Sequence, residues 1–171
     1  MQRLIIIVTV FLYSQSLFAQ SLKKYPISQT GCFVYFLCDP GTFALDKSPD
    51  SSDVYTAECS SEDMSYGIIC VKLKDKITDP KTSEDVLVSY LDYLKNSLSI
   101  TSAAGYGKGH KLKDKEDTRG VIDYWKDKDN NWKVAGWTNG KFICVLYVYT
   151  KKDIPEIKAD VFLNSLLFPG M

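Results

Sequence analysis

The chain has 171 residues, of which 45% are hydrophobic and 25% are charged, values typical of one folded globular domain. Basic and acidic side chains number 21 each. This balance argues against a nucleic-acid-binding protein and against electrostatic binding to membranes, because both need a cationic surface.

The N-terminus has the pattern of a secretory signal peptide. Arg3 supplies the positive charge, Leu4–Tyr13 form an apolar stretch, and Ser14–Ala19 include small residues suited to cleavage. The apolar stretch is about half as long as a bilayer-spanning helix needs to be. We therefore expect residues 1–19 to be removed on export.

The expected cleavage follows Ala19, so that the mature chain begins at Gln20. Cleavage after Ser16 is the alternative, because Leu17 is larger than the residue usually found three positions before the cut. The predicted product is one domain, residues 20–171. It has no transmembrane anchor and lies in the periplasm or outside the cell.

All five cysteines belong to the predicted mature chain: Cys32, Cys38, Cys59, Cys70 and Cys144. In an oxidising compartment four of them can form two disulfides, with a pairing that the spacing does not determine. Cys144 lies within the apolar segment Phe142–Val148, so we predict that it is the unpaired, buried cysteine. A reactive thiol would need a nearby base, and the one histidine, His110, is distant in sequence.

Short strands are predicted at Cys32–Cys38, Thr42–Leu45, Val54–Cys59 and Ser65–Leu73. The first ends at the turn residues Asp39-Pro40-Gly41, and a polar loop is expected over Asp46–Asp53. The last two form a predicted hairpin around Ser60–Met64. Because Tyr66–Val71 is almost continuously apolar, that strand is expected to be covered on both faces.

Two helices are predicted. Asp79–Asn96 begins with Thr82 and Asp85 in the spacing of a capping box, and its apolar stripe comprises Leu87, Leu91, Leu94 and Leu98. The second helix begins near Asp153, has Pro155 in its first turn, and ends at Pro169-Gly170. Its apolar positions are Ile157, Val161, Phe162 and Leu166. Loops are expected over Ser97–Gly109 and Lys111–Asp117.

The segment Thr118–Thr150 predicts a three-stranded antiparallel meander. Asn139-Gly140 is typical of a two-residue type I′ turn, which would pair Trp137 with Phe142. A similar turn at Asp129-Asn130 would pair Lys128 with Asn131.

Alternation along these strands predicts which side chains share a face. One face carries Trp125, Trp132, Val134, Ile143, Val145 and Tyr147, and the other carries Tyr124, Ala135, Trp137, Phe142, Cys144 and Leu146. Both faces are apolar, so both need a cover. The predicted fold is therefore α+β: an antiparallel sheet, built from a hairpin and the meander, with helices on both faces.

No pattern nominates a catalytic, cofactor-binding or metal-binding residue. Gly105–Gly109 contains three glycines but follows a helix and lacks the ending of a phosphate-binding loop, so we interpret it as a flexible connection. Asp127–Asn131 resembles the start of a calcium loop, yet Trp132 and Thr138 replace the glycine and glutamate that such a loop requires. One histidine, His110, is too few for a hydrolytic zinc site, and the sequence has no Gly-x-Ser-x-Gly motif whose serine His110 could activate.

Aromatic residues are abundant, with eleven Tyr, eight Phe and three Trp. Since the predicted register turns the tryptophans toward covered surfaces, core packing is the favoured interpretation. The alternative is a binding surface near the hairpin tips, where Trp125 and Trp132 would lie closest to solvent.

The order of elements resembles the PsbP-like group. The resemblance rests on the strand Tyr66–Val71, the helix Val86–Leu98, the meander Gly120–Tyr149 and the closing run Phe162–Pro169. It implies an α/β/α sandwich and, since members of the group include peripheral subunits that bind other proteins, a role in protein binding. No functional residue of the group maps onto this chain, and a fold does not by itself imply a function.

Together these observations favour a non-enzymatic interaction or accessory module of the cell envelope, whose partner is another protein or a surface ligand. The alternative is a small hydrolase or small-ligand-binding protein with a cleft near Gly105–Gly109.

Overall fold

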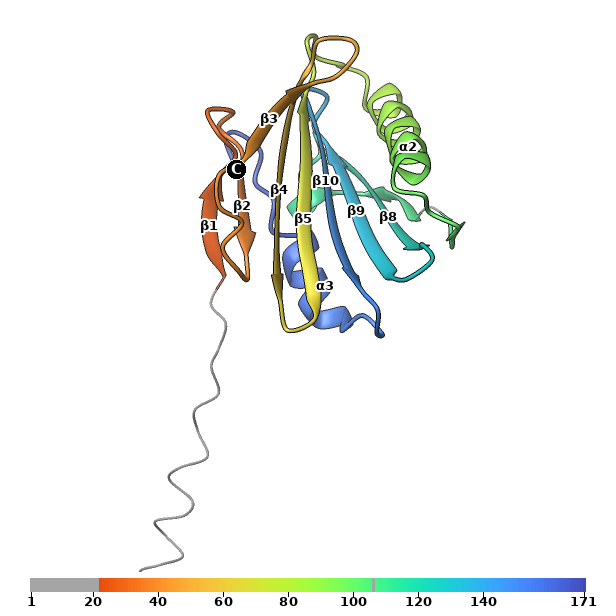
Figure 1. Cartoon of the computed structure of the whole chain (residues 1–171). Helices are drawn as coiled ribbons and strands as arrows, with labels where there is room; N and C mark the ends of the chain where they lie inside the picture. The colour runs from red at the N-terminus through yellow and green to blue at the C-terminus, as the bar shows by residue number, and fades with distance from the viewer. Residues whose placement is uncertain (1–21, 106) are drawn as a thin grey trace, which may run out of the picture.

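The computed structural model describes residues 22–105 and 107–171, which form a large antiparallel sheet, a separate hairpin and two helices (Figure 1). The predicted signal peptide and both cleavage positions lie outside the described residues. No described helix is long and apolar enough to cross a membrane. The α+β class and the antiparallel sheet are confirmed.

The large sheet has eight strands: β3 (Ala44–Lys47), β4 (Asp53–Ser61), β5 (Met64–Lys72), β6 (Ser102–Ala103), β7 (Gly107–His110), β8 (Arg119–Lys126), β9 (Asn131–Thr138) and β10 (Phe142–Thr150). Their order is β3-β4-β5-β10-β9-β8-β6, and β7 also pairs with β8. The separate hairpin consists of β1 (Lys23–Pro26) and β2 (Phe33–Phe36). The loop prediction for Ser97–Gly109 is wrong in part, because β6 and β7 pair with the edge of β8.

The predicted first helix is confirmed as α2 (Pro80–Ser97), but its cap differs. The Asp79 carboxylate accepts a hydrogen bond from the backbone N–H of Thr82 at 2.8 Å, so Asp79 is the N-cap. The predicted capping box is wrong, since Asp85 pairs with Lys81 one turn earlier on the exposed surface.

The second helix, α3 (Glu156–Leu163), is shorter than predicted. Beyond it the chain is extended, and Leu167 exchanges two backbone hydrogen bonds with Phe33 of β2 at 2.8 and 2.9 Å. The predicted apolar stripe is partly wrong: Ile157 is 83% exposed, whereas Ala159 is buried. The buried positions of α3 are Ala159, Phe162 and Leu163, which follow the spacing i, i+3, i+4, so the buried face of the helix is not the one that Ile157 and Val161 share.

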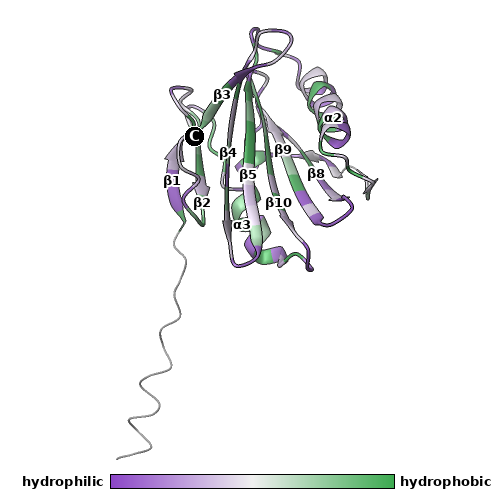
Figure 2. Cartoon of the chain, in the orientation of Figure 1, coloured by the Kyte–Doolittle hydropathy of each residue, from purple (hydrophilic) through white to green (hydrophobic). Residues whose placement is uncertain are grey.

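The two faces of the sheet carry separate cores. Leu87, Leu91 and Leu94 of α2 pack against one face, chiefly over β8 and β9. Phe162 and Leu163 of α3 pack against the other face, which the β1–β2 hairpin also helps to cover. Figure 2 shows the hydrophobic residues along the central strands and hydrophilic ones on the outer strand β1.

The predicted faces of the meander are largely confirmed, but both turn registers are wrong by two residues. Trp137 pairs with Cys144 and not with Phe142, and Lys126 in place of Lys128 pairs with Asn131. In each turn four residues separate the last paired positions, which are Lys126 with Asn131 and Thr138 with Ile143. A shift by two leaves every side chain on its predicted face, because the side-chain period of a strand is two. Tyr124 is the exception in burial, being exposed.

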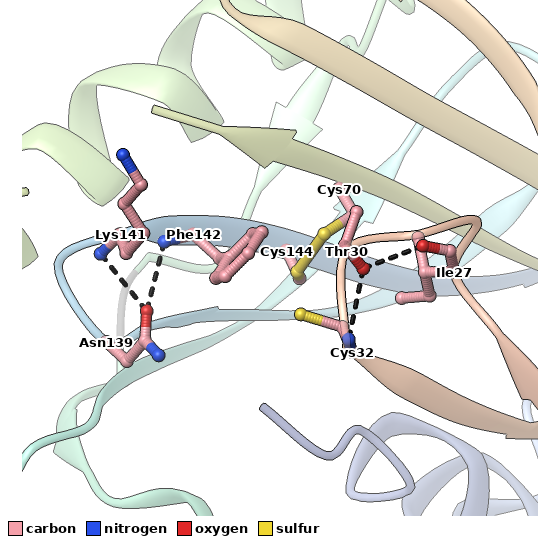
Figure 3. The surroundings of a disulfide bond; sticks show 8 residues. All are labelled: Ile27, Thr30, Cys32, Cys70, Asn139, Lys141, Phe142 and Cys144. Atoms are coloured by element: carbon pink, nitrogen blue, oxygen red, sulfur yellow. Dashed lines mark hydrogen bonds between the residues drawn. A yellow bond between two sulfur atoms is a disulfide. The ribbon is translucent and has the colours of Figure 1, made fainter. Parts of the chain in front are cut away.

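Two disulfides join Cys38 to Cys59 and Cys70 to Cys144. The prediction that Cys144 is unpaired is wrong: the register of β5 and β10 places Cys70 directly opposite it, with the two Cα atoms 4.0 Å apart. The free cysteine is Cys32, which is buried in the same core cluster (Figure 3). Burial raises the pKa of its thiol to about 11, a setting that disfavours the reactive thiolate.

Candidate functional site

Carboxylates of the chain itself accept hydrogen bonds from the glycine-rich segment Gly105–Gly109. The backbone N–H of Gly105 donates to Asp123 at 3.1 Å, and that of Gly109 donates to Glu84 at 2.9 Å. His110, at the end of β7, is exposed. The ring of His110 lies beside Gly107, where an added Cβ atom would stand 3.1 Å from Nε2, so the described contacts of this segment are hydrogen bonds and packing within the chain.

Asp127–Asn131, whose sequence resembles the start of a calcium loop, lies at the turn between β8 and β9. The Asp127 carboxylate accepts hydrogen bonds from the backbone of Asp129 and Asn130 and from the indole of Trp132 at 2.8 Å. Within the described part of the chain there is no group of three or more side chains placed to hold a metal ion.

All three tryptophans are buried, which confirms their predicted role in core packing. The expectation that Trp125 and Trp132 approach solvent is wrong. Trp132 stacks on Tyr149 with ring centroids 4.3 Å apart, while Trp125 donates to the buried Asp123 at 2.6 Å. Cross-strand aromatic pairing and α2 cover these rings.

The strongest candidate site is an apolar cleft of about 530 Å³, here called the α2 cleft. Because α2 packs chiefly over β8 and β9, it leaves the β4–β5 side of its face open. The cleft lies between α2, the β3–β4 connection and the ends of β4, β5 and β10. Its apolar lining comprises Val54, Val71, Leu73, Val86 and Ile143, joined by Tyr90 and Tyr93 of the helix.

The floor of the α2 cleft follows from strand register. Val54, Val71 and Ile143 lie directly opposite one another on β4, β5 and β10 and therefore share a face. Val71 and Ile143 are buried, whereas Val54 is half-buried. Branched side chains of this kind form a fixed apolar surface, because their χ1 angles are restricted.

A pair of tyrosines forms the helical wall. Tyr90 and Tyr93 are stacked with centroids 5.9 Å apart, and Tyr93 is 60% exposed. Burial raises the pKa of Tyr90 to about 12, so its hydroxyl stays neutral and can donate a hydrogen bond. Exposed tyrosines beside an apolar pocket are common anchors in protein interfaces.

The opposite rim is acidic. Asp46, Lys47 and Asp50 line it, and the ammonium of Lys47 is paired with Asp53 outside the lining. A hydrogen bond from Ser48 holds the pKa of Asp50 below its usual range, so Asp50 is ionised at neutral pH and is no general acid. The rim thus presents negative charge to whatever occupies the cleft.

A row of aromatic side chains crosses the other end of the same face. The Glu58 carboxylate accepts hydrogen bonds from Tyr147 at 2.9 Å and from Tyr149 at 2.8 Å. The Tyr147 ring lies over Gly67 of β5, where a Cβ atom would stand 2.2 Å from the ring. Only glycine leaves room for this crossing.

Sequence patterns do not nominate either feature. The floor residues look like ordinary strand interior, and their accessibility depends on where α2 comes to rest. Comparison with protein-family models and with curated proteins gives no match for the chain.

Proposed function

We propose that the protein is an exported, non-catalytic binding module of the cell envelope, periplasmic or secreted, that receives an apolar group of a partner protein in the α2 cleft. The observation that supports this proposal best is the cleft of about 530 Å³ that Val54, Val71 and Ile143 line beside the tyrosine pair of α2. Concave apolar surfaces with a few polar groups at the rim are the usual form of binding sites. The two disulfides suit an oxidising compartment.

The charge at the rim indicates the chemistry of the partner. Two carboxylates and one ammonium line it, and that ammonium is already paired. An anionic group, such as the headgroup of a fatty acid, would be repelled by the carboxylates of Asp46 and Asp50. A protein segment with aliphatic side chains next to Lys or Arg complements both the floor and the rim.

Enzymatic function has less support. The carboxylates at the rim are engaged in turn hydrogen bonds or local contacts, as Asp50 is with Ser48 and Ser52. The alternative of a hydrolase or ligand site beside Gly105–Gly109 draws no support from the geometry, since the amides of Gly105 and Gly109 bind Asp123 and Glu84.

A small apolar molecule is the second candidate occupant. The volume of about 530 Å³ lies within the range of about 300–1,000 Å³ typical of small-ligand pockets. A neutral or cationic amphiphile would suit the rim for the reason given above.

The architecture supports membership of the PsbP-like α/β/α group as part of this proposal. α2 and α3 pack against opposite faces of one antiparallel sheet, which is the arrangement that the resemblance implies. The resemblance to this group favours protein binding but identifies no functional residue in the chain.

The proposal is tested with a library of 12-residue peptides displayed on phage and selected on the disulfide-bonded mature chain. Ser89→Trp blocks the cleft from the exposed side of α2. Ser97→Trp is its matched control, because each serine hydroxyl donates to the carbonyl four residues earlier, at 3.0 and 3.1 Å, and only Ser89 lines the cleft.

We expect the selected peptides to combine aliphatic residues with Lys or Arg. Their affinity should fall at least about tenfold for Ser89→Trp, which corresponds to about 1.4 kcal/mol, and stay unchanged for Ser97→Trp. Peptides that bind both variants equally well would contradict the proposal. The second candidate occupant, a small apolar molecule, is tested by titration with the neutral amphiphile octyl glucoside, followed by NMR at the residues that line the α2 cleft.

A further inference from the structure

A second cleft of about 460 Å³ lies at the end of the sheet where the β4–β5 turn, the β8–β9 turn and the end of β10 meet. It is here called the Tyr149 cleft. Its lining is polar apart from one ring: Asp63, Ser65, Asn130, Tyr149, Thr150, Lys151 and Lys152. None of these residues lines the α2 cleft.

We propose that the Tyr149 cleft is a saccharide-binding site in which one sugar ring stacks on Tyr149. One side of the Tyr149 ring packs on Trp132 at 4.3 Å, and the ring also lines the cleft. The C–H groups on the face of a pyranose carry partial positive charge, which complements the negative face of an aromatic ring.

The ring is fixed before any ligand arrives. Its hydroxyl donates to Glu58 at 2.8 Å, and its stacking partner Trp132 is itself held by Asp127 at 2.8 Å. A platform locked from two sides loses little conformational entropy on binding, so it is preorganised for a flat ligand face.

Polar groups of both kinds surround the ring. Asn130 directs its NH₂ group to Asp127 at 3.1 and 3.3 Å, which leaves its carbonyl oxygen as an acceptor for the cleft. Lys151 is exposed and supplies a donor, and the Ser65 hydroxyl, which is bonded to Ser60 at 2.8 Å and to the Tyr149 hydroxyl, keeps a lone pair as an acceptor. Sugar hydroxyls both donate and accept, so they match this mixture better than an anion or an apolar group would.

The carboxylate of Asp63 disfavours an anion in the cleft. Lys152 is neutralised by Asp63 at 2.7 Å, and a carboxylate at that place would repel phosphate. The ammonium of Lys151 is then the one further charge of the lining, and because it is exposed it stays hydrated while an uncharged sugar binds.

The test uses NMR titration of the isotope-labelled, disulfide-bonded mature chain with three uncharged probes: cellohexaose, maltohexaose and the hexamer of N-acetylglucosamine. We expect at least one probe to shift the amide signals of residues 63–65, 130 and 149–152. The affinity should be the same in 50 and 500 mM NaCl, because no ion pair forms. Tyr149→Ala should weaken binding by at least about tenfold.

Tyr93→Ala is the control, since it removes a tyrosine from the α2 cleft and should leave sugar binding unchanged. Should Tyr149→Ala fail to fold, Tyr149→Phe keeps the ring face and should retain binding, while Lys151→Ala on the exposed surface should weaken it about threefold. The proposal is overturned by the absence of shifts with all three probes at 10 mM, by displacement with phosphate, or by unchanged affinity of Tyr149→Ala. Shifts confined to the α2 cleft would also overturn it while leaving the proposed function standing.

Discussion

Replacement of Asp123 by Asn should be among the most damaging single changes that alter no side-chain volume. Asp123 is completely buried on β8. One carboxylate oxygen accepts from the backbone of Gly105 and Tyr124, and the other accepts from Trp125 and from Lys95 of α2 at 3.1 Å. This carboxylate therefore connects the end of α2, the β6–β7 connection and the sheet.

The magnitude follows from what asparagine can keep. Its oxygen can still accept from the two backbone amides, but its NH₂ group faces two donors and loses both of their hydrogen bonds. Lys95, only 17% exposed, also loses the nearer of its two carboxylates. Breaking a buried ion pair in this way costs about 3–5 kcal/mol, which corresponds to a fall in Tm of about 10 °C for a domain of this size.

Urea unfolding of the mature chain at pH 7, followed by circular dichroism, measures the loss. Asp92→Asn is the control: Asp92 also pairs with Lys95, but at 3.6 Å and on the surface, so the expected cost is about 0–1 kcal/mol. The double variant Asp123→Asn/Lys95→Met should regain part of the loss, because it removes the buried cation as well. A loss below about 1 kcal/mol for Asp123→Asn would refute the assigned role of this ion pair.

Three further predictions concern acid stability, packing and thiols. Burial opposes the charge of Asp127, but hydrogen bonds from Asn130, Asp129 and Trp132 outweigh this effect and lower its pKa to about 2. The stabilisation of the fold by the Asp127 carboxylate should be complete above about pH 5 and be lost as the pH falls from about 4 toward 2. The urea midpoint of Asp127→Asn should lack this part of the pH dependence. Gly67→Ala forces the Tyr147 ring off β5 and should cost about 1–3 kcal/mol in the same unfolding assay, whereas Gly107→Ala, whose Cβ would meet the exposed His110 ring at 3.1 Å, should cost less. Without reductant, Ellman's reagent should detect no thiol in the native mature chain and one, Cys32, in 6 M guanidinium; three thiols would show that a disulfide is absent.

The sequence was sufficient to predict the faces of the meander but not its register, and one physical reason accounts for both errors. The Asp127 carboxylate accepts from the backbone N–H groups two and three residues later. Asn139 does the same with Lys141 and Phe142 at 3.1 and 3.0 Å. Such side-chain bonds stabilise a four-residue loop, so Asn139-Gly140 does not form the two-residue type I′ turn: only Gly140 has a positive φ.

The disulfide pairing and the clefts could not be predicted from the sequence, for a different reason. Cys70 and Cys144 meet because the last strand inserts between β5 and β9, and no local pattern records that insertion. The α2 cleft likewise depends on where the helix settles, which involves Gly136: a Cβ there would stand 2.8 Å from Leu87. Long-range placement of this kind is decided by tertiary packing and not by periodicity.

The position of β10 also bears on how the protein reaches its compartment. If the chain is exported from its N-terminus, as we propose, β3, β4 and β5 cross long before β10, because the partners of β5 on that side lie about 75 residues further on. Until then the apolar edge of β5 stays unpaired, a condition that favours intermolecular strand pairing. The sheet can close only when nearly the whole chain has crossed, so truncations after Asn139 should yield an aggregating chain and not a smaller folded one, and export should benefit from a holding chaperone.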